Sequence, residues 1–348
     1  MGTMADTSYR GRRAASIENR FLRVTVLQEG GHIAEITEKE SGVNPLWSPP
    51  WPSIEPSTYD PARHPEYGRD AESKLLAGIM GHNLCLDIFG GPSAEEAAAG
   101  LTVHGESSVA AYDILRENER LLLRAHLPMA QLMFERSIDL HDSVVQIRER
   151  VENLSASDRP MAWTQHVTLG PPFLEKGVTQ FRASATRSKV FESEFGDATY
   201  LAAGAEFDWP LAPRKDGGVA DLRVFNADPV SGAYTTHLMD GQREQAFFTA
   251  FHPGMRLAFS YVWNRVDFPW LGIWEENFGR TGAPWNGQTL TRGMEFGASP
   301  MPETRRRMIG RGSLFGVPAY RWLPAKATVE VEYLASAWRA DSVPEPAL

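Results

Sequence analysis

Apolar and polar residues alternate with a period of two through much of this 348-residue chain. In the segment 132–140, four large apolar residues fall on one parity and mostly polar residues on the other. A turn-like His-Asp-Ser sequence follows, and the alternation resumes over residues 144–151. This pattern predicts an antiparallel β-hairpin with one buried face.

The same alternation recurs along the chain and predicts many short strands. The further predicted strands are 21–27 and 32–39 around Gly30-Gly31, 112–115 and 121–127, 161–169, 257–263, and 329–333. Helical signals are few, and the best is Ser93–Ala99, where good helix formers follow a serine cap. Many short strands indicate an all-β sandwich or barrel.

Loops and domain boundaries follow from where proline and glycine fall. The chain has 24 Pro and 30 Gly, concentrated between the predicted strands, and the segments 47–69 and 277–288 look like long loops. Long ordered loops over a rigid sheet are where binding sites tend to lie. No domain boundary is evident, so we expect one domain over residues 1–348, with residues 1–15 as a flexible N-terminal segment.

Charge and cysteine content narrow the choice of partners. The net charge of −9 disfavours nucleic acid, because binding to phosphates rests on Lys and Arg. Cys85 is the only cysteine, which excludes an internal disulfide and a thiolate metal cluster, and we expect it in the core.

No apolar run approaches the length of a membrane span, and residues 1–13 lack the apolar stretch of a secretory signal, so we expect a cytoplasmic protein. The basic run Arg305–Arg307 is interpreted as a solvated loop or strand edge.

Candidate chemistry comes from polar residues inside apolar strands, because the common nucleotide, serine-hydrolase and zinc-protease motifs are absent. His166 lies in the middle of the predicted strand 161–169, and Glu295 stands between Met294 and Phe296. Each also has a simpler interpretation, a hydrogen-bonded core histidine or an edge glutamate facing water. His82, His104 and His166 lack the spacing of metal ligands, so we expect neither a metal nor a cofactor.

Five segments form an ordered set across nearly the whole chain. They are 17–26 with Gly30-Gly31-His32-Ile33, Leu101-Thr-Val-His104-Gly105, Val151-Glu-Asn-Leu through Pro160 to Gln165-His166, Gly293-Met-Glu295-Phe with Ser299-Pro300, and Trp322-Leu-Pro-Ala-Lys-Ala-Thr-Val-Glu-Val-Glu-Tyr. Together they resemble the aldose 1-epimerase, or galactose mutarotase-like, family. The resemblance implies a supersandwich of antiparallel sheets with few short helices, and a small carbohydrate as the partner.

The resemblance also implies site residues. It makes His166 the general acid and Glu295 the general base, and it places His104 beside the sugar on the side of the ring oxygen. The arginine element of the family corresponds here to residues 78–83, which contain His82 and Asn83 but no arginine. We expect His82, Asn83 and Trp163 to contact the sugar. A mid-chain aspartate of the family has two possible counterparts here, Asp221 and Asp240.

An acid and a base suffice for interconversion of anomers. One group removes the proton of the C1 hydroxyl while the other protonates the ring oxygen, and after rotation about C1–C2 the ring closes on the other face. Histidine and a carboxylate can each be in the required form near neutral pH. A catalytic pair is expected to face each other across one pocket.

The region before Glu295 is rich in aromatic and polar residues. Trp274 and Trp285 can stack on a sugar ring, while Glu276 and Arg280 can bind its hydroxyl groups, although a sheet core with a solvated loop would look the same. Arg280 and Arg292 are the candidates for a sugar phosphate, and Glu275 or Glu276 is a reserve base. Two alternatives stay open, a non-catalytic carbohydrate-binding protein and a sugar lyase or hydrolase that pairs Glu275 or Glu276 with Glu295.

Overall fold

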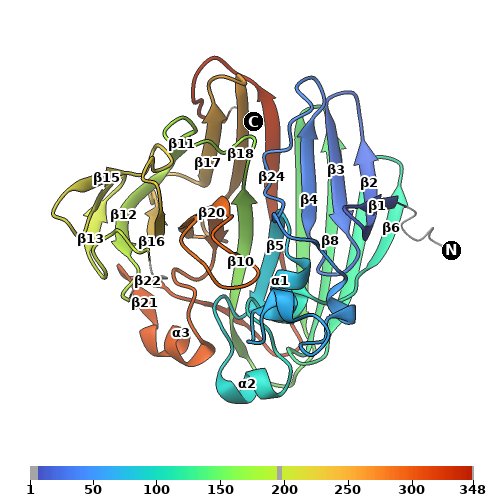
Figure 1. Ribbon diagram of the computed structural model, residues 1–348. Helices are drawn as coiled ribbons and strands as arrows, with labels where there is room; N and C mark the ends of the chain where they lie inside the picture. Colours follow the sequence, from blue (N-terminus) through green and yellow to red (C-terminus); the bar gives the residue numbers. More distant parts are fainter. Residues whose placement is uncertain (1–6, 194–197, 347–348) are drawn as a thin grey trace.

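A computed structural model describes residues 7–193 and 198–346. Two large sheets, in which neighbouring strands pair antiparallel, pack face to face (Figure 1). The 12-stranded sheet has, in spatial order, β1 (Thr7–Tyr9), β2 (Arg12–Glu18), β3 (Leu22–Leu27), β4 (Ile33–Glu38), β5 (His82–Asp87), β10 (Arg159–Leu169), β20 (Leu290–Gly297), β19 (Trp270–Asn277), β16 (Ser231–Met239), β12 (Ala185–Val190) and β13 (Glu206–Asp208), with β23 (Arg321–Leu323) paired to the start of β10.

The second sheet has eight strands and covers one face of the first. Its spatial order is β11 (Gln180–Ala183), β17 (Gln245–His252), β18 (Leu257–Asn264), β24 (Thr328–Arg339), β9 (Val144–Asn153), β8 (Leu132–His141), β7 (Arg120–Leu127) and β6 (Asp113–Glu117). Two small hairpins, β14 (Leu211–Pro213) with β15 (Val219–Asp221) and β21 (Ser313–Leu314) with β22 (Val317–Pro318), lie outside both sheets.

Helices are short in the described part of the chain. They are α1 (Ser73–Gly78), α2 (Ala94–Ala98) and α3 (Arg305–Arg311), with 3-10 turns at Pro56–Thr58, Pro65–Tyr67 and Glu106–Ser108. The serine cap predicted for α2 is confirmed, because Ser93 and Glu96 bond each other's backbone in a capping box. The all-β prediction is therefore confirmed, as are the hairpins β3–β4, β6–β7 and β8–β9.

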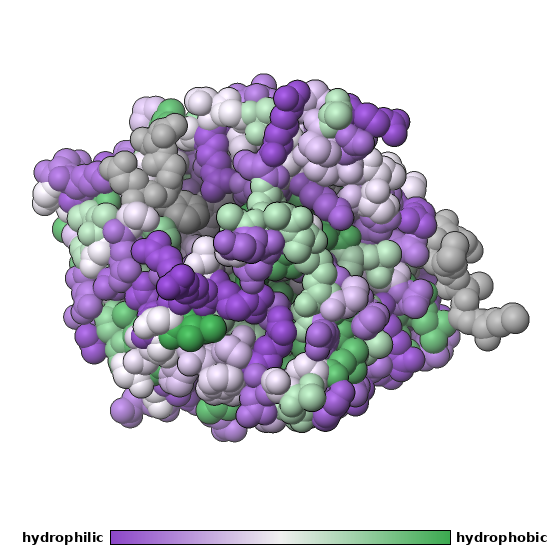
Figure 2. Space-filling model, turned by 90° about the horizontal axis from the view of Figure 1, so that it is seen from below, coloured by the Kyte–Doolittle hydropathy of each residue, from purple (hydrophilic) through white to green (hydrophobic). Residues whose placement is uncertain are grey.

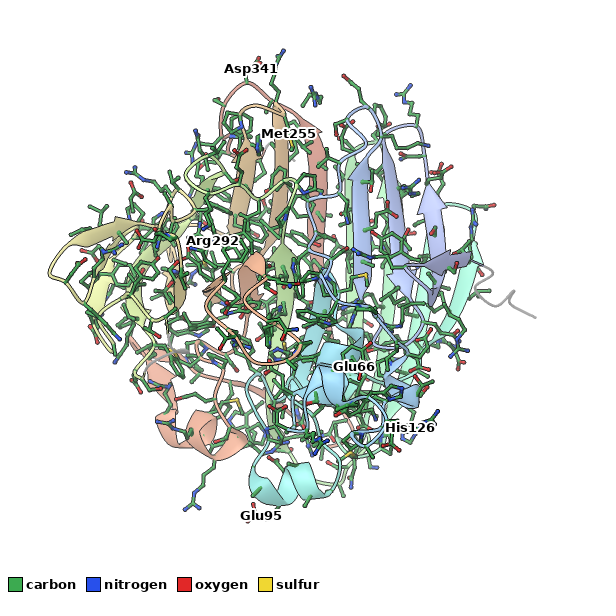
Figure 3. The ribbon with its side chains drawn as sticks, viewed as in Figure 1. Glu66, Glu95, His126, Met255, Arg292 and Asp341 are labelled. Atoms are coloured by element: carbon green, nitrogen blue, oxygen red, sulfur yellow. The ribbon has the colours of Figure 1, made fainter. Side chains whose placement is uncertain are left out.

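The central strands β5, β10, β20 and β19 are buried on both faces. Side chains alternate along a strand, so Trp163 and Val167 of β10 pack into the main core between the sheets, which Figure 3 shows densely filled. Thr164, His166 and Thr168 have the opposite parity and face outward. Loops and helices cover this outer face, which explains why polar residues there are buried.

A second apolar cluster, rich in tryptophan, packs the covering loops against the outer face of the large sheet. Trp285 stacks on Trp47 at 6.3 Å between ring centroids and meets Trp51 and Trp274 edge-on at 5.1 and 6.0 Å. Trp47 and Trp51 come from the loop before β5, and Trp285 comes from the loop between β19 and β20. The two long loops predicted from the sequence therefore meet over the same face of the large sheet.

Two expectations from the sequence were wrong. Residues 7–15, which we expected to be a flexible segment, form β1 and the start of β2, where buried Arg12 pairs with Glu55 at 2.9 Å; residues 1–6 of that predicted segment lie outside the described residues. Arg305–Arg307 opens α3 instead of a loop or strand edge. Arg305 binds Asp87 and Glu96, which ties α3 to β5 and α2.

The surface on the side of α2 and α3 is mostly hydrophilic, with scattered apolar residues (Figure 2). Within residues 7–193 and 198–346, no helix is long and apolar enough to span a membrane.

Candidate active site

His166 and Glu295 occupy directly opposed positions on the neighbouring strands β10 and β20. On the outer face of the sheet, His166 Nε2 and Glu295 Oε1 lie 3.0 Å apart, and both side chains are buried. The other ring nitrogen, Nδ1, lies 2.9 Å from Thr168 Oγ1, which fixes the orientation of the imidazole. The two residues therefore stand side by side on one wall, whereas we expected them to face each other across a pocket.

Two glycines make room for the polar groups on this wall. A β-carbon at Gly293 would lie 2.3 Å from Glu295 Oε1, and one at Gly272 would lie 2.1 Å from the hydroxyl oxygen of Tyr234. Gly272 is the register partner of Glu295 on β19. Only glycine permits such close approach inside a strand, so the carboxyl of Glu295 and the hydroxyl of Tyr234 lie flat against the sheet.

Burial sets the protonation of the pair. It raises the pKa of the Glu295 carboxyl well above its ordinary value of about 4.5, because the ionised form loses its hydration. Burial, with a further contribution from His104, lowers the pKa of His166 well below its ordinary value of about 6.5. Among the described residues, none donates an aligned hydrogen bond to Glu295 Oε1. The favoured state is therefore a protonated carboxyl beside a neutral imidazole.

His104 is the second histidine of the site, with its ring centroid 4.8 Å from that of His166. It adopts a positive φ of 68°, an uncommon backbone conformation for a residue other than glycine. Its Nδ1 lies 2.6 Å from the carbonyl oxygen of Phe89, so Nδ1 carries the proton and donates. Burial lowers the pKa of His104 to about 4, which leaves Nε2 as a hydrogen-bond acceptor.

These groups border a cavity of about 210 Å³. His104, His166, Tyr234 and Glu295 share its wall with Trp274, Trp285, Arg280 and Glu72. Drug-sized ligands typically occupy about 300–1,000 Å³, so the size favours a single small ring over an oligomer. The mixture of aromatic faces with hydrogen-bonding groups fits a polar ring compound.

Arg280 forms one side of the cavity. Its guanidinium lies 4.6 Å from the ring centroid of Trp285 and 5.6 Å from that of Trp274. It pairs with Glu72 at 3.4 Å and Glu276 at 3.5 Å. Glu276 also accepts the backbone N–H groups of Gly279 and Arg280, so it braces the loop and does not border the cavity. Trp274 Nε1 is buried without a hydrogen-bond partner among the described residues.

Besides Glu276, three residues expected at the sugar do not border the cavity. His82 points into the core, where its ring nitrogens contact Tyr261 and Gln165, and Trp163 donates from Nε1 to Glu149 there. Asn83 is the register partner of His166 on the outer face but does not border the cavity. Strand parity explains the positions of His82 and Trp163, because adjacent residues such as His82 and Asn83 face opposite sides of a sheet.

The remaining candidates also lie outside the cavity wall. Glu275 and Arg292 form a buried ion pair at 2.9 Å, and Figure 3 shows Arg292 within the packed interior. Asp221 pairs with Arg223 on the surface, and Asp240 lies near Arg243. Within the described ranges, no three His, Cys, Asp or Glu side chains cluster in a way that could hold a metal ion.

Sequence reasoning missed Glu72, Tyr234 and the two glycines. Tyr234 looks like any aromatic residue in a β-rich segment, and Glu72 precedes α1, which we did not predict. Gly272 and Gly293 lie inside β19 and β20, where a glycine indicates close approach of another group, but we did not predict strands over either range.

No protein-family model matches the sequence, and no curated protein matches it. Solved structures do match. A proposed aldose 1-epimerase from Klebsiella pneumoniae superposes with a TM-score of 0.67 and 13% identity, covering 97% of this chain and 83% of that protein.

Two further structures agree over the full length. A proposed aldose 1-epimerase from Escherichia coli K12 has a TM-score of 0.62 and 12% identity, covering 94% of this chain and 100% of its own. A galactose mutarotase-like protein from Clostridium acetobutylicum has a TM-score of 0.61 and 13% identity, covering 97% and 99%. Identities this low show a shared fold and no more. The chain has the galactose mutarotase-like β-sandwich fold.

Proposed function

We propose that this protein is an isomerase that interconverts the α and β anomers of an aldose by acid–base ring opening. His166 serves as the general acid and Glu295 as the general base. The observation that carries the proposal is the 3.0 Å separation of His166 Nε2 and Glu295 Oε1 on the wall of a cavity sized for one small ring.

The side-by-side placement of the pair suits this reaction. The C1 hydroxyl oxygen and the ring oxygen are bonded to the same carbon, so the two protons that move lie close together. An acid and a base on one wall can reach both oxygens at once, whereas groups on opposite walls would suit a displacement at carbon. The proximity of Glu295 to His166 therefore favours hemiacetal opening over glycoside hydrolysis.

The protons balance within the pair. The proton of Glu295 first passes to His166 Nε2, 3.0 Å away, which gives an ionised carboxylate and a protonated imidazole. Ionised Glu295 then takes the proton of the C1 hydroxyl, protonated His166 gives its Nε2 proton to the ring oxygen, and the bond between C1 and the ring oxygen breaks to leave an aldehyde. The pair is then neutral, which is the state that burial favours. Ring closure on the other face of the aldehyde reverses both transfers, so no proton has to leave the site.

The surrounding groups supply binding and orientation. Trp274 and Trp285 offer apolar faces to the ring, and Trp274 Nε1 and the Arg280 guanidinium are donors for its hydroxyl oxygens. His104 Nε2 accepts a hydrogen bond from a sugar hydroxyl, because its other nitrogen already donates to Phe89. This acceptor role would suit the position beside the sugar that the resemblance implies for His104.

Polarimetry on freshly dissolved α-aldoses tests the proposal. The wild type should accelerate the approach to anomeric equilibrium, and His166→Asn or Glu295→Gln should each lower kcat by about 10²–10⁴-fold. His252→Gln is a matched control, because His252 lies on β17 of the other sheet and pairs with surface-exposed Glu175. A wild type that binds sugars without accelerating exchange would instead establish a carbohydrate-binding protein.

A further inference from the structure

Tyr234 is a cavity residue to which neither the motifs nor the acid–base scheme assigns a task. It lies on β16 as the register partner of Trp274, and its side chain is buried. We propose that Tyr234 is a positioning residue whose hydroxyl donates a hydrogen bond that stabilises ionised Glu295, and so makes the base available at the start of ring opening. This inference rests on the proposed function, because Glu295 is the base in that scheme.

The placement of the hydroxyl is specific. The hydroxyl lies over Gly272 of β19, where an added β-carbon would meet its oxygen at 2.1 Å. Because Gly272 is the register partner of Glu295, the hydroxyl lies beside that residue on the same wall. The ring of Tyr234 is held edge-on by Phe89 and Phe191, with centroids 6.3 and 6.0 Å away. Its position is therefore fixed before any ligand binds.

The chemistry requires such a donor. In the ionised state Glu295 needs hydrogen bonds, since an unsolvated buried carboxylate is costly. Burial first, and Glu295 second, raise the pKa of Tyr234 well above its ordinary value of about 10, so the hydroxyl stays protonated and can only give a hydrogen bond near neutral pH. Hydrogen bonds from a neutral donor to a carboxylate are about twice as strong as neutral pairs.

The hydroxyl of Tyr234 also lies 3.3 Å from the carbonyl oxygen of Pro300, a long contact. When Glu295 is ionised, its carboxylate turns from Gly293 toward Gly272, and the O–H bond of Tyr234 rotates away from Pro300 to meet it. The other titratable groups around Glu295 and Tyr234 are His166 on β10, Cys85 on β5, His104 in the loop after α2, Glu303 after β20, and Arg280 with Glu72 across the cavity.

The test measures the pKa of Glu295 directly, by NMR of the side-chain carboxyl carbon in protein labelled with ¹³C-glutamate, with Glu295→Gln to assign the signal. Tyr234→Phe should raise the pKa of Glu295 relative to the wild type. Tyr67→Phe is the matched control, because Tyr67 belongs to the same apolar cluster but donates to the Pro52 carbonyl outside the cavity. It should leave that pKa unchanged.

The kinetic readout follows the same variants. Tyr234→Phe should lower kcat about 10- to 100-fold, the loss expected for one hydrogen bond to a charged group, while KM changes little. Because the active pair holds one proton and loses it at the pKa of Glu295, the alkaline limb of the pH profile should move to higher pH. An unchanged Glu295 pKa in Tyr234→Phe would overturn the inference, whatever happens to stability. A wild type without exchange activity would overturn the proposed function instead, and the carboxyl titration would still decide the role of Tyr234.

Discussion

Two buried carboxylates, Glu149 and Glu295, lie on opposite sides of the large sheet and contact adjacent residues of β10. Glu149, between the sheets, is saturated: one oxygen accepts from Arg136 and Tyr333, and the other from Trp163 and Gln165. Glu295, on the outer face, has His166 at 3.0 Å but no aligned donor at Oε1 among the described residues.

The difference between these carboxylates separates structure from chemistry. A buried carboxylate with every lone pair engaged holds its neighbours in place and has no capacity for a ligand. A buried carboxylate that is short of donors and borders a cavity is unstable as an anion and ready to take a proton. Gln165 and His166, adjacent on one strand, serve these two sites on opposite faces.

The largest expected effect is on stability at the saturated site. Glu149→Gln should lower the free energy of unfolding by about 3–5 kcal/mol, because buried Arg136 loses the partner that compensates its charge. Urea unfolding followed by fluorescence measures the loss. A loss below about 1 kcal/mol would show that the Glu149 network is not structural, and the contrast with Glu295 would fail.

A smaller effect, on activity alone, is expected at Gly293, which lies beneath the carboxyl of Glu295. Gly293→Ala places a methyl group where Glu295 Oε1 now lies, and the flexible carboxyl can move aside at little cost to stability. Displacing the base by about 1 Å should lower kcat about 10²-fold. Gly310→Ala on α3, where a methyl group meets open space, is the control. Equal rates in both variants would mean that the position of the carboxyl does not matter.

The smallest expected effect is a gain in stability from Glu295→Gln. As pH rises above about 4.5, the unfolded carboxyl releases its proton while the folded one, with its raised pKa, retains it, so wild-type stability falls with pH over that range. Glutamine does not titrate, and the variant should gain about 1 kcal/mol over the wild type at pH 7 and nothing near pH 4. Thermal unfolding at both pH values measures the difference, and an equal effect at both would rule out the raised pKa.

The fold was largely predictable because strand periodicity and turn residues are local signals. The hairpins at 21–39, 112–127 and 132–151 follow from alternation alone. The N-terminal strands were missed because the burial of Arg12 depends on Glu55 and on the carbonyl groups of Glu29 and Gly78, which lie 17 to 66 residues away in the chain. The helix α3 was missed because its first residues read as a charge run, while Arg305 is held by Asp87 and Glu96 from distant segments.

The candidate site was predictable only in part, because strand parity and loop contacts are tertiary. Sequence alone placed His82 and Asn83 together, although they face opposite sides of the sheet. It also gave no reason to prefer Tyr234, whose role depends on a glycine on the neighbouring strand. Trp274, Arg280 and Trp285 do border the cavity, because the loop after β19 folds back over the outer face.

The most direct test of the central claim is ¹H NMR exchange between α and β anomers at equilibrium, measured for wild type, Glu149→Gln and Glu295→Gln at equal concentrations of folded protein. The account predicts acceleration by the wild type, substantial retention of that rate by Glu149→Gln despite its lower stability, and a loss of about 10²–10⁴-fold in Glu295→Gln. Wild-type exchange rates in Glu295→Gln would contradict the account.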